Sequence, residues 1–290
     1  MPEFKTIQDL IQLAENKKVS IGQVTLEWEA ESAEKPKEEI WNKMKNYWQV
    51  MKQSINQGLT QDIRSVTGLT GGDAKRMANS KSLVICDNMK MAIARAMAVA
   101  EVNAAMKKIV AAPTAGSSGI IPAALSIMTE KLGISEKQVV QALFTASGVG
   151  VVIANNATIS GAEGGCQAEC GVASAMAAAA IAELAGGTPK QIGHAVAIAL
   201  KNMLGLVCDP VAGLVEIPCI KRNVIGVVNA LVSAEMALAG IKSTIPVDEV
   251  IFALDDVSKR LPEELKETAC GGLAITPTGL KIKEEFLGKD

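Results

Sequence analysis

The feature that most constrains how this chain can fold is a long stretch that is almost free of charge. The 126 residues from 109 to 234 carry 13 charged side chains, whereas residues 1–60 carry 17 and residues 235–290 carry 18. The same stretch holds 15 of the 25 glycines and a single aromatic residue, Phe144. It therefore predicts the interior of the protein, built from helices that pack closely through small side chains.

Hydrophobic periodicity predicts an all-α fold. Between Pro36 and Leu59, apolar residues recur every three or four positions, which is typical of an amphipathic helix. β-branched runs are few and short. We expect one compact domain over residues 1–290, with a charged helical N-terminal segment at 1–60 and a core with a C-terminal tail at 61–290. Further helices are expected at 73–80, 88–109, 120–132, 136–147, 172–185, 189–203, 223–240 and 246–259.

Charge and composition exclude several classes of function. The net charge of −2 gives no basic surface for nucleic acid and no polybasic segment for a membrane. Residues 138–162 form an uncharged run of 25, long enough to span a bilayer, but they include Gln141, Asn155 and Asn156 and lack an aromatic belt. We expect a buried helix that enters a polar loop there.

The N-terminus and the cysteine count favour a cytoplasmic protein. Residues 1–18 are charged throughout and lack the apolar core of a secretory signal. The six cysteines are then free thiols, metal ligands or catalytic groups rather than disulfides. The one histidine, His194, excludes a His-rich metal site and lies on a predicted apolar helix, where a structural role is expected.

Three loops rich in glycine and hydroxyl side chains lie between the predicted helices. They span residues 65–73, 113–119 and 155–166. A loop at a helix N-terminus presents free N–H groups to an anion such as a carboxylate. Asp73, in the first loop, is expected to be a helix N-cap. The candidate substrate-binding residues of the three loops are Thr70, Gly71, Gly72, Thr114, Gly116, Ser117, Ser118, Asn155 and Asn156.

Three cysteines lie at helix breaks beside glycine or proline, which is where a ligand of an iron–sulfur cluster is expected. They are Cys166, Cys208 and Cys219, at intervals of 42 and 11 residues. These intervals differ from the short CxxC spacing of zinc ribbons and ferredoxins. The pattern alone therefore leaves two interpretations open, a three-cysteine metal centre and ordinary buried thiols.

Five segments resemble the α chain of the bacterial iron–sulfur L-serine dehydratases, and the resemblance covers nearly the whole chain. The most specific part is the double-cysteine segment CDPVAGLVEIPC. The segments are TGLTGGDA, APTAGSSGIIPA, NNATISGAEGGCQAE, LKNMLGLVCDPVAGLVEIPCIKRN and GGLAITPTG.

The resemblance implies a function and a cofactor. It implies that Cys166, Cys208 and Cys219 hold a [4Fe–4S] cluster in a helical catalytic domain that uses no pyridoxal phosphate. One iron without a protein ligand then acts as a Lewis acid while L-serine is converted to pyruvate and ammonia. A β subunit is the expected partner, in a heterodimer or larger assembly, because two-chain relatives carry the regulatory and substrate-binding domain on a separate chain.

Some roles stay open within this interpretation. Arg222, three residues after Cys219, is a candidate partner of the substrate carboxylate and equally a structural arginine. The catalytic base is not identified, and the resemblance suggests histidines of the β part. Some single-chain members cap the open iron with a C-terminal cysteine. The tail here, 285–290, has none, so an oxygen-sensitive cluster is expected.

Two other functions fit the same residues. One is a related cluster-dependent lyase that acts on another β-substituted amino acid, such as an L-cysteine desulfidase. The other is a helical module without catalytic activity, holding an iron–sulfur cluster or zinc.

Overall fold

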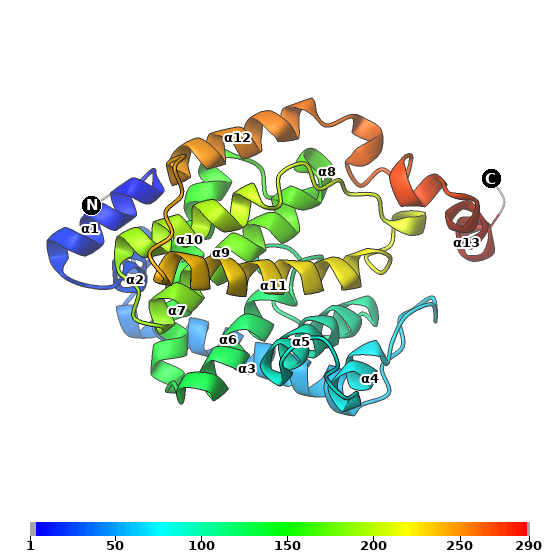
Figure 1. Ribbon diagram of the computed structural model, residues 1–290, viewed down its shortest axis with the longest axis horizontal. Helices are drawn as coiled ribbons and strands as arrows, with labels where there is room; N and C mark the ends of the chain where they lie inside the picture. The colour runs from blue at the N-terminus through cyan, green and yellow to red at the C-terminus, as the bar shows by residue number, and fades with distance from the viewer. Residues whose placement is uncertain (1–3, 289–290) are drawn as a thin grey trace.

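The computed structural model describes residues 4–288, and in this range the chain is helical and contains no β-strand, which confirms the all-α expectation (Figure 1). The first three residues of the N-terminal segment and the last two of the tail lie outside the described residues. The α-helices are α1 (Ile7–Lys17), α2 (Ile21–Ser32), α3 (Lys37–Thr60), α4 (Asp73–Asn79), α5 (Asp87–Ala104), α6 (Ile120–Leu132), α7 (Glu136–Asn156), α8 (Gly161–Gly164), α9 (Val172–Leu184), α10 (Pro189–Lys201), α11 (Cys219–Leu238), α12 (Val247–Arg260) and α13 (Pro277–Leu287). Short helical turns are η1 (Gln167–Gly171, a π-helix) and the 3-10 turns η2 (Val211–Gly213), η3 (Glu263–Leu265) and η4 (Gly272–Ile275).

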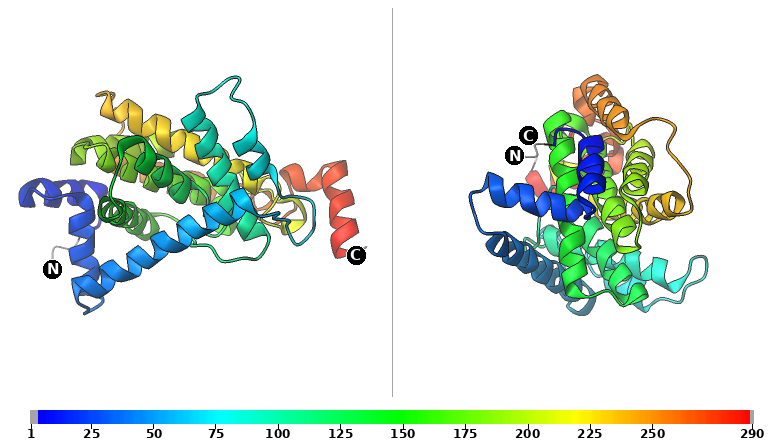
Figure 2. Two further views of the ribbon diagram at one scale, coloured as in Figure 1. Left: turned by 90° about the horizontal axis from the view of Figure 1, so that it is seen from below. Right: turned by 90° about the vertical axis from the view of Figure 1, so that its left-hand side faces the viewer.

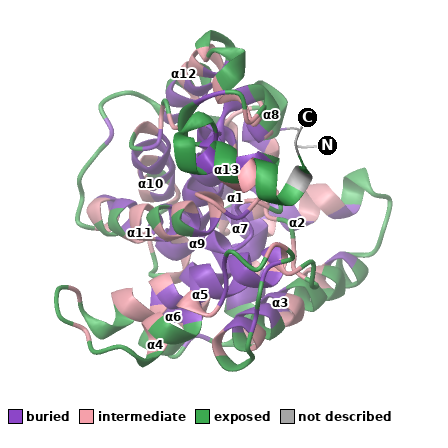
Figure 3. Ribbon diagram, turned by 90° about the vertical axis from the view of Figure 1, so that its right-hand side faces the viewer, coloured by how far each residue is buried: buried purple, intermediate pink, exposed green. Residues whose placement is uncertain are grey.

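Helix α9 is the centre of the fold. Its sequence, VASAMAAAAIAEL, is apolar on every side, and all but its last two residues are buried. It packs against α6, α7, α10 and α11, which surround it (Figure 3). Alanine side chains allow these neighbours to approach closely, so the low aromatic content of the middle of the chain matches its interior position.

Helix α7 contains most of the uncharged run 138–162, which is long enough to span a membrane. It has the length and composition to cross a bilayer, and 67% of its apolar window is buried inside the fold. It packs against α2 and α9, as a core helix does. The expected end at residue 147 and the polar loop beginning at Asn155 are wrong, because Val149, Val152 and Ile153 continue the buried face and the helix runs to Asn156.

Two other helix boundaries differ from expectation. Helix α5 ends at Ala104 instead of residue 109, and Met106 just beyond it has a left-handed φ of 55°. Helix α11 begins at Cys219 instead of residue 223, directly after Pro218. Proline is favoured at a helix start because its missing N–H has no partner to lose there. The last of the three candidate cysteines is therefore the first residue of a helix.

The N-terminal segment forms α1, α2 and α3, of which only α3 was expected as a defined helix. Helix α3 runs along one side of the bundle and packs against α5, α6 and α7 (Figure 2). Helices α1 and α13 lie at opposite ends of the long axis (Figures 1 and 2). The chain after α12 crosses toward the end of the molecule where α13 lies, and this places residues 261–276 beside α8 and the connection from α10 to α11 (Figure 1).

The close approach of α2 and α7 depends on a glycine. A Cβ atom added at Gly22 would lie 2.2 Å from the main-chain oxygen of Gln141. At Gly193 of α10, by contrast, an added Cβ would meet only the terminal Cδ1 atom of Ile11, at 2.7 Å. Backbone cannot move aside as the end of a flexible side chain can.

We predict that Gly22→Ala lowers the free energy of unfolding by about 1–3 kcal/mol, because overpacking at a helix crossing forces the backbone to shift. Gly193→Ala is the matched control and should change it far less. Urea unfolding of both variants measures the difference. Equal midpoints for the two variants would show that the α2–α7 contact does not require glycine.

Candidate metal centre

Cys166 lies at a turn that brings its segment close to the connection before Cys208. Gly165 has a φ of 75°, and a Cβ atom added to it would lie 3.0 Å from the main-chain oxygen of Leu206. Cys166 then precedes the π-helix η1, which continues into α9, and it is 3% exposed. Insertions of π-helix are frequent at functional sites because they redirect side chains.

Cys208 lies in an extended connection that pairs with the C-terminal part of the chain. Its N–H donates to the Leu265 oxygen at 2.9 Å, and its own oxygen accepts from the N–H of Glu267 at 2.7 Å. These two bonds form an isolated parallel bridge between Cys208 and Lys266. The segment around Glu267 is thereby fixed beside a thiol that is 3% exposed.

Cys219, at the start of α11, is tied to the second glycine-rich loop through Asn223. The Asn223 amide donates to the main-chain oxygens of Cys219 at 3.0 Å and Gly116 at 2.7 Å, and its oxygen accepts from the N–H of Gly119 at 2.9 Å. Asn223 is 1% exposed. One buried amide thus holds the third cysteine and the 113–119 loop together.

Gln167 connects the segments that carry the first two cysteines, Cys166 and Cys208. Its N–H donates to the Leu206 oxygen at 2.9 Å. Its side-chain oxygen accepts from the N–H of Gly205 at 2.8 Å, and its side-chain nitrogen donates to the Ser258 hydroxyl at 2.9 Å. The side chain is fully buried. It therefore joins the Cys166 turn, the segment before Cys208 and α12.

Arg222 links its helix to the segment around Cys208. Its Nη2 lies 2.7 Å from Oδ1 of the buried Asp209, and its Nη1 donates to the Val207 oxygen at 2.7 Å. Asp209 in turn accepts from the N–H of Leu273 at 2.8 Å. These contacts link α11 to the residues on either side of Cys208. A role of Arg222 toward a substrate carboxylate stays a prediction.

The three thiols share one electrostatic environment. A hydrogen bond from Cys170 and the positive charge of Arg222 lower the pKa of the Cys166 thiol, while burial opposes them. Burial, together with the negative charge of Cys166, raises the pKa of Cys219 to about 12 and raises that of Cys208 as well. Because burial and the charge of Cys166 disfavour ionisation of Cys208 and Cys219, a bound cation would favour their thiolates.

Two carboxylates that the sequence analysis did not identify lie in this centre. Oxygens of Glu169 and Glu267 and the sulfur of Cys208 all lie within 4.8 Å of one another. Burial raises the pKa of Glu169, and a hydrogen bond from Thr114 opposes this shift. Glu169 could have been recognised from the sequence, because it is one of the few charged residues in the charge-poor stretch 109–234. Glu267 stands in the charged tail and gave no such signal.

The second predicted loop lies at this centre. The Thr114 hydroxyl bonds Glu169 and lies 3.1 Å from the hydroxyl of Ser117. A Cβ atom added at Gly116 would lie 3.3 Å from both carboxylate oxygens of Glu169. Ser117 and Ser118 are fully buried. Within the described part of the chain, no hydrogen bond uses the main-chain N–H of Gly116.

The first predicted loop does bind carboxylates, but they belong to the chain itself. The Thr70 hydroxyl donates to Glu216 at 2.9 Å. The N–H groups of Gly72 and Asp73 donate to Glu101 at 3.2 and 2.8 Å. These donors are satisfied internally. Gly71 is held against the Ile63 oxygen, which would lie 2.2 Å from an added Cβ atom. A substrate role for Thr70, Gly71 and Gly72 stays a prediction.

The remaining candidates do not contact the thiols. Asn155 and Asn156 are exposed at the end of α7, and Asn156 donates to the main-chain oxygens of Val152 and Lys5. His194, on α10, accepts a hydrogen bond from the Ser243 N–H at 3.3 Å, and burial and then nearby lysines lower its pKa. The structural role expected for His194 is consistent with this bond and stays a prediction.

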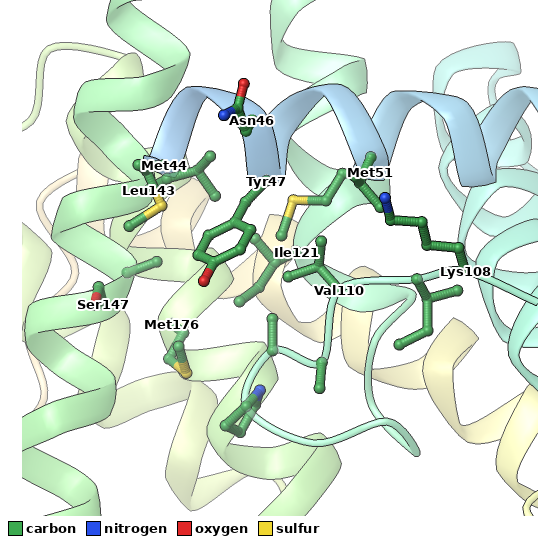
Figure 4. Close-up of a pocket in the computed structure, with 16 residues that line it drawn as sticks. Met44, Asn46, Tyr47, Met51, Lys108, Val110, Ile121, Leu143, Ser147 and Met176 are labelled. Atoms are coloured by element: carbon green, nitrogen blue, oxygen red, sulfur yellow. The ribbon is translucent and has the colours of Figure 1, made fainter. Parts of the chain in front are cut away.

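A separate apolar cavity of about 570 Å³ lies between α3, α6, α7, α9 and residues 108–113 (Figure 4). Tyr47 points into it from α3, with Ile121, Leu143 and Met176 around it (Figure 4). None of the three cysteines and neither of the two carboxylates lines it. The titratable centre therefore lies outside this cavity.

The comparisons with known proteins agree with the resemblance. Residues 16–274 match the family model described as serine dehydratase alpha chain. The chain is 50% identical to a protein of Bacillus subtilis named probable L-serine dehydratase, alpha chain, covering 98% of this chain and 96% of that protein. It is 46% identical to the L-serine dehydratase, alpha chain, of Peptoniphilus asaccharolyticus, covering 98% of each chain. A longer relative, the L-serine dehydratase of Streptomyces coelicolor, is 40% identical over 94% of this chain and 61% of its own length.

We predict that Gln167→Met destabilises the protein, because the variant removes the acceptor of the Gly205 N–H and the donor to the Ser258 hydroxyl, which keeps its own bond to the Leu254 oxygen. Hydrogen bonds of this kind contribute about 0.5–1.5 kcal/mol each. Gln53→Met is the control, since the Gln53 side chain is exposed and makes no hydrogen bond within residues 4–288. Urea unfolding of the cluster-free chain gives both values, and a Gln167→Met variant as stable as the control contradicts the prediction.

Proposed function

The chain belongs to the serine dehydratase alpha chain family, and from this premise we propose that it is the α subunit of an enzyme that converts L-serine to pyruvate and ammonia. The observation that carries the proposal is that buried polar contacts join the three segments that bear Cys166, Cys208 and Cys219. Gln167 bonds residues 205 and 206, and the Arg222–Asp209 pair joins the helix that begins at Cys219 to the residues on either side of Cys208.

We propose that Cys166, Cys208 and Cys219 hold a [4Fe–4S] cluster. The donor set fits this group: the thiols are free, Cys166 and Cys208 are 3% exposed, and the negative charge of Cys166 raises the pKa of both Cys208 and Cys219. When bound, such a cluster with three protein thiolates supplies an iron without a protein ligand, which acts as a Lewis acid on a hydroxyl or carboxylate. No pyridoxal phosphate is required for this chemistry.

The 113–119 loop is the proposed binding site of the substrate carboxylate. It adjoins the thiols through Asn223 and Glu169, and the N–H of Gly116 has no acceptor in the described part of the chain. A loop that leads into a helix N-terminus favours an anion, and the Gly116 N–H is the donor available to it there. The first loop offers less, because Glu101 and Glu216 already occupy its donors.

The proton acceptor for the α-carbon is proposed to come from a partner subunit. The one histidine of this chain is bound to Ser243 and has no contact with the thiols. Relatives of this length are named alpha chains, and the Streptomyces relative, named simply L-serine dehydratase, is substantially longer. We infer that the additional part corresponds to a separate β subunit here.

The first test is cluster binding. Anaerobic reconstitution should give about four irons and four sulfides per chain, and Cys208→Ala should remove both the visible absorbance and the activity measured with the partner. Cys86→Ala is the control, because Cys86 is an exposed thiol at the start of α5. Activity that survives Cys208→Ala contradicts the three-cysteine assignment. Rates on L-serine, L-threonine and L-cysteine identify the preferred substrate.

The second test asks whether this chain alone contains all the catalytic groups. The reconstituted chain alone should bind iron and sulfide but turn over L-serine slowly, and addition of the β subunit should restore pyruvate formation. The measurement is the rate of pyruvate release with and without the partner at equal cluster content. Full turnover by the α chain alone would show that all catalytic groups belong to it.

A further inference from the structure

Glu169, Cys208 and Glu267 bring three metal-ligating atoms together from three separate parts of the chain. One oxygen of each carboxylate and the sulfur of Cys208 lie within 4.8 Å of one another. Glu169 belongs to the π-helix η1, Cys208 to the connection after α10, and Glu267 to the segment after α12. In residues 4–288, Cys166 and Cys219 are not part of any such group.

The thiol in this group has no partner of its own. Cys208 is 3% exposed, and no hydrogen bond of the described residues involves its sulfur. The thiol of Cys166, in contrast, accepts a hydrogen bond from Cys170. Glu169 has one donor, the Thr114 hydroxyl, but in the described part of the chain the Cys208 sulfur has none. A buried sulfur beside two carboxylates is an arrangement that a cation stabilises.

The backbone of Glu267 is held in an unfavourable conformation beside Cys208. Its φ of 63° lies in the left-handed region, which is unfavourable for any residue with a Cβ atom. The N–H bond to the Cys208 oxygen, 2.7 Å long, holds it there. Its carboxylate makes no ion pair or hydrogen bond within the described part of the chain. Strain is therefore retained at a position whose side chain has no structural partner.

We propose that Glu169, Cys208 and Glu267 form a site for a single divalent transition-metal ion of the zinc class in the cluster-free chain. One thiolate and two carboxylates suit such an ion, whereas Mg²⁺ and Ca²⁺ require oxygen ligands throughout. The ion replaces the proton of the Cys208 thiol, and three protein ligands leave a fourth position for water. The site shares Cys208 with the cluster set, so the two metal states exclude each other.

This site does not depend on the proposed cluster, because the two ligand sets differ at four residues. Cys166 and Cys219 belong only to the cluster set. Glu169 and Glu267 belong only to the single-ion set. Variants on either side therefore separate the two proposals.

The experiment uses the full chain freed of iron and chelator under anaerobic conditions. Equilibrium dialysis against Zn²⁺ should give one ion per chain, and Co²⁺ should give the charge-transfer absorbance of a bound thiolate. Glu169→Gln, Glu267→Gln and Cys208→Ser should each weaken Zn²⁺ binding by more than about 100-fold, since loss of a direct ligand exceeds the usual effect of a residue behind it. Cys219→Ala and the exposed Glu263→Gln should bind as the unchanged chain does.

Several results overturn the proposal. These are absence of stoichiometric Zn²⁺, unchanged binding by Glu267→Gln, or equal loss in Cys219→Ala and Cys208→Ser, which would assign the ion to the three thiols. Circular dichroism of each variant confirms that it is folded. Iron and sulfide uptake by the same variants reports separately on the cluster, so failure of one proposal is distinguishable from failure of the other.

Discussion

The burial of helix α9 is the constraint on which the rest of the structure depends. Residues 172–182 leave no face to solvent, so the four helices around α9 fix its position and direction. The π-helix η1 continues directly into it, and Cys166 precedes η1. A side chain at the end of an immobile helix is itself well fixed, which is a requirement for a metal ligand or a catalytic group.

Buried polar side chains hold the segments around the three cysteines in fixed positions. Gln167, Asn223 and the Arg222–Asp209 pair each join segments that are far apart in the sequence, and each has main-chain partners next to a cysteine. Main-chain groups have fixed directions, so these bonds fix the backbone on both sides of the thiols. A buried amide with every bond satisfied contributes modest stability but penalises alternative arrangements strongly, because any shift leaves a donor unpaired.

Much of the fold and part of the site could be predicted from the sequence. Periodicity and end signals located most core helices, since these depend on neighbouring residues, and the cysteines were identified by their motifs. The π-helix could not be predicted from the sequence. The roles of Gln167 and Glu267 could not be predicted either, because the residues that they contact are tens of positions away in the sequence. The first loop shows a further limit: its sequence indicated that it binds a carboxylate, but only the fold shows that Glu101 and Glu216 provide one. The predicted break at Asn155 failed because packing against α2 and α9 outweighed the local polar signal.

The proposal that three thiols of this chain hold a cluster with one iron left for the substrate is tested most directly by Mössbauer spectroscopy. The sample is the chain reconstituted with Mössbauer-active iron and combined with its partner subunit. We expect one iron environment distinct from the others, and a change in that environment alone when L-serine is added. A spectrum in which all irons are equivalent and none responds to L-serine would contradict it.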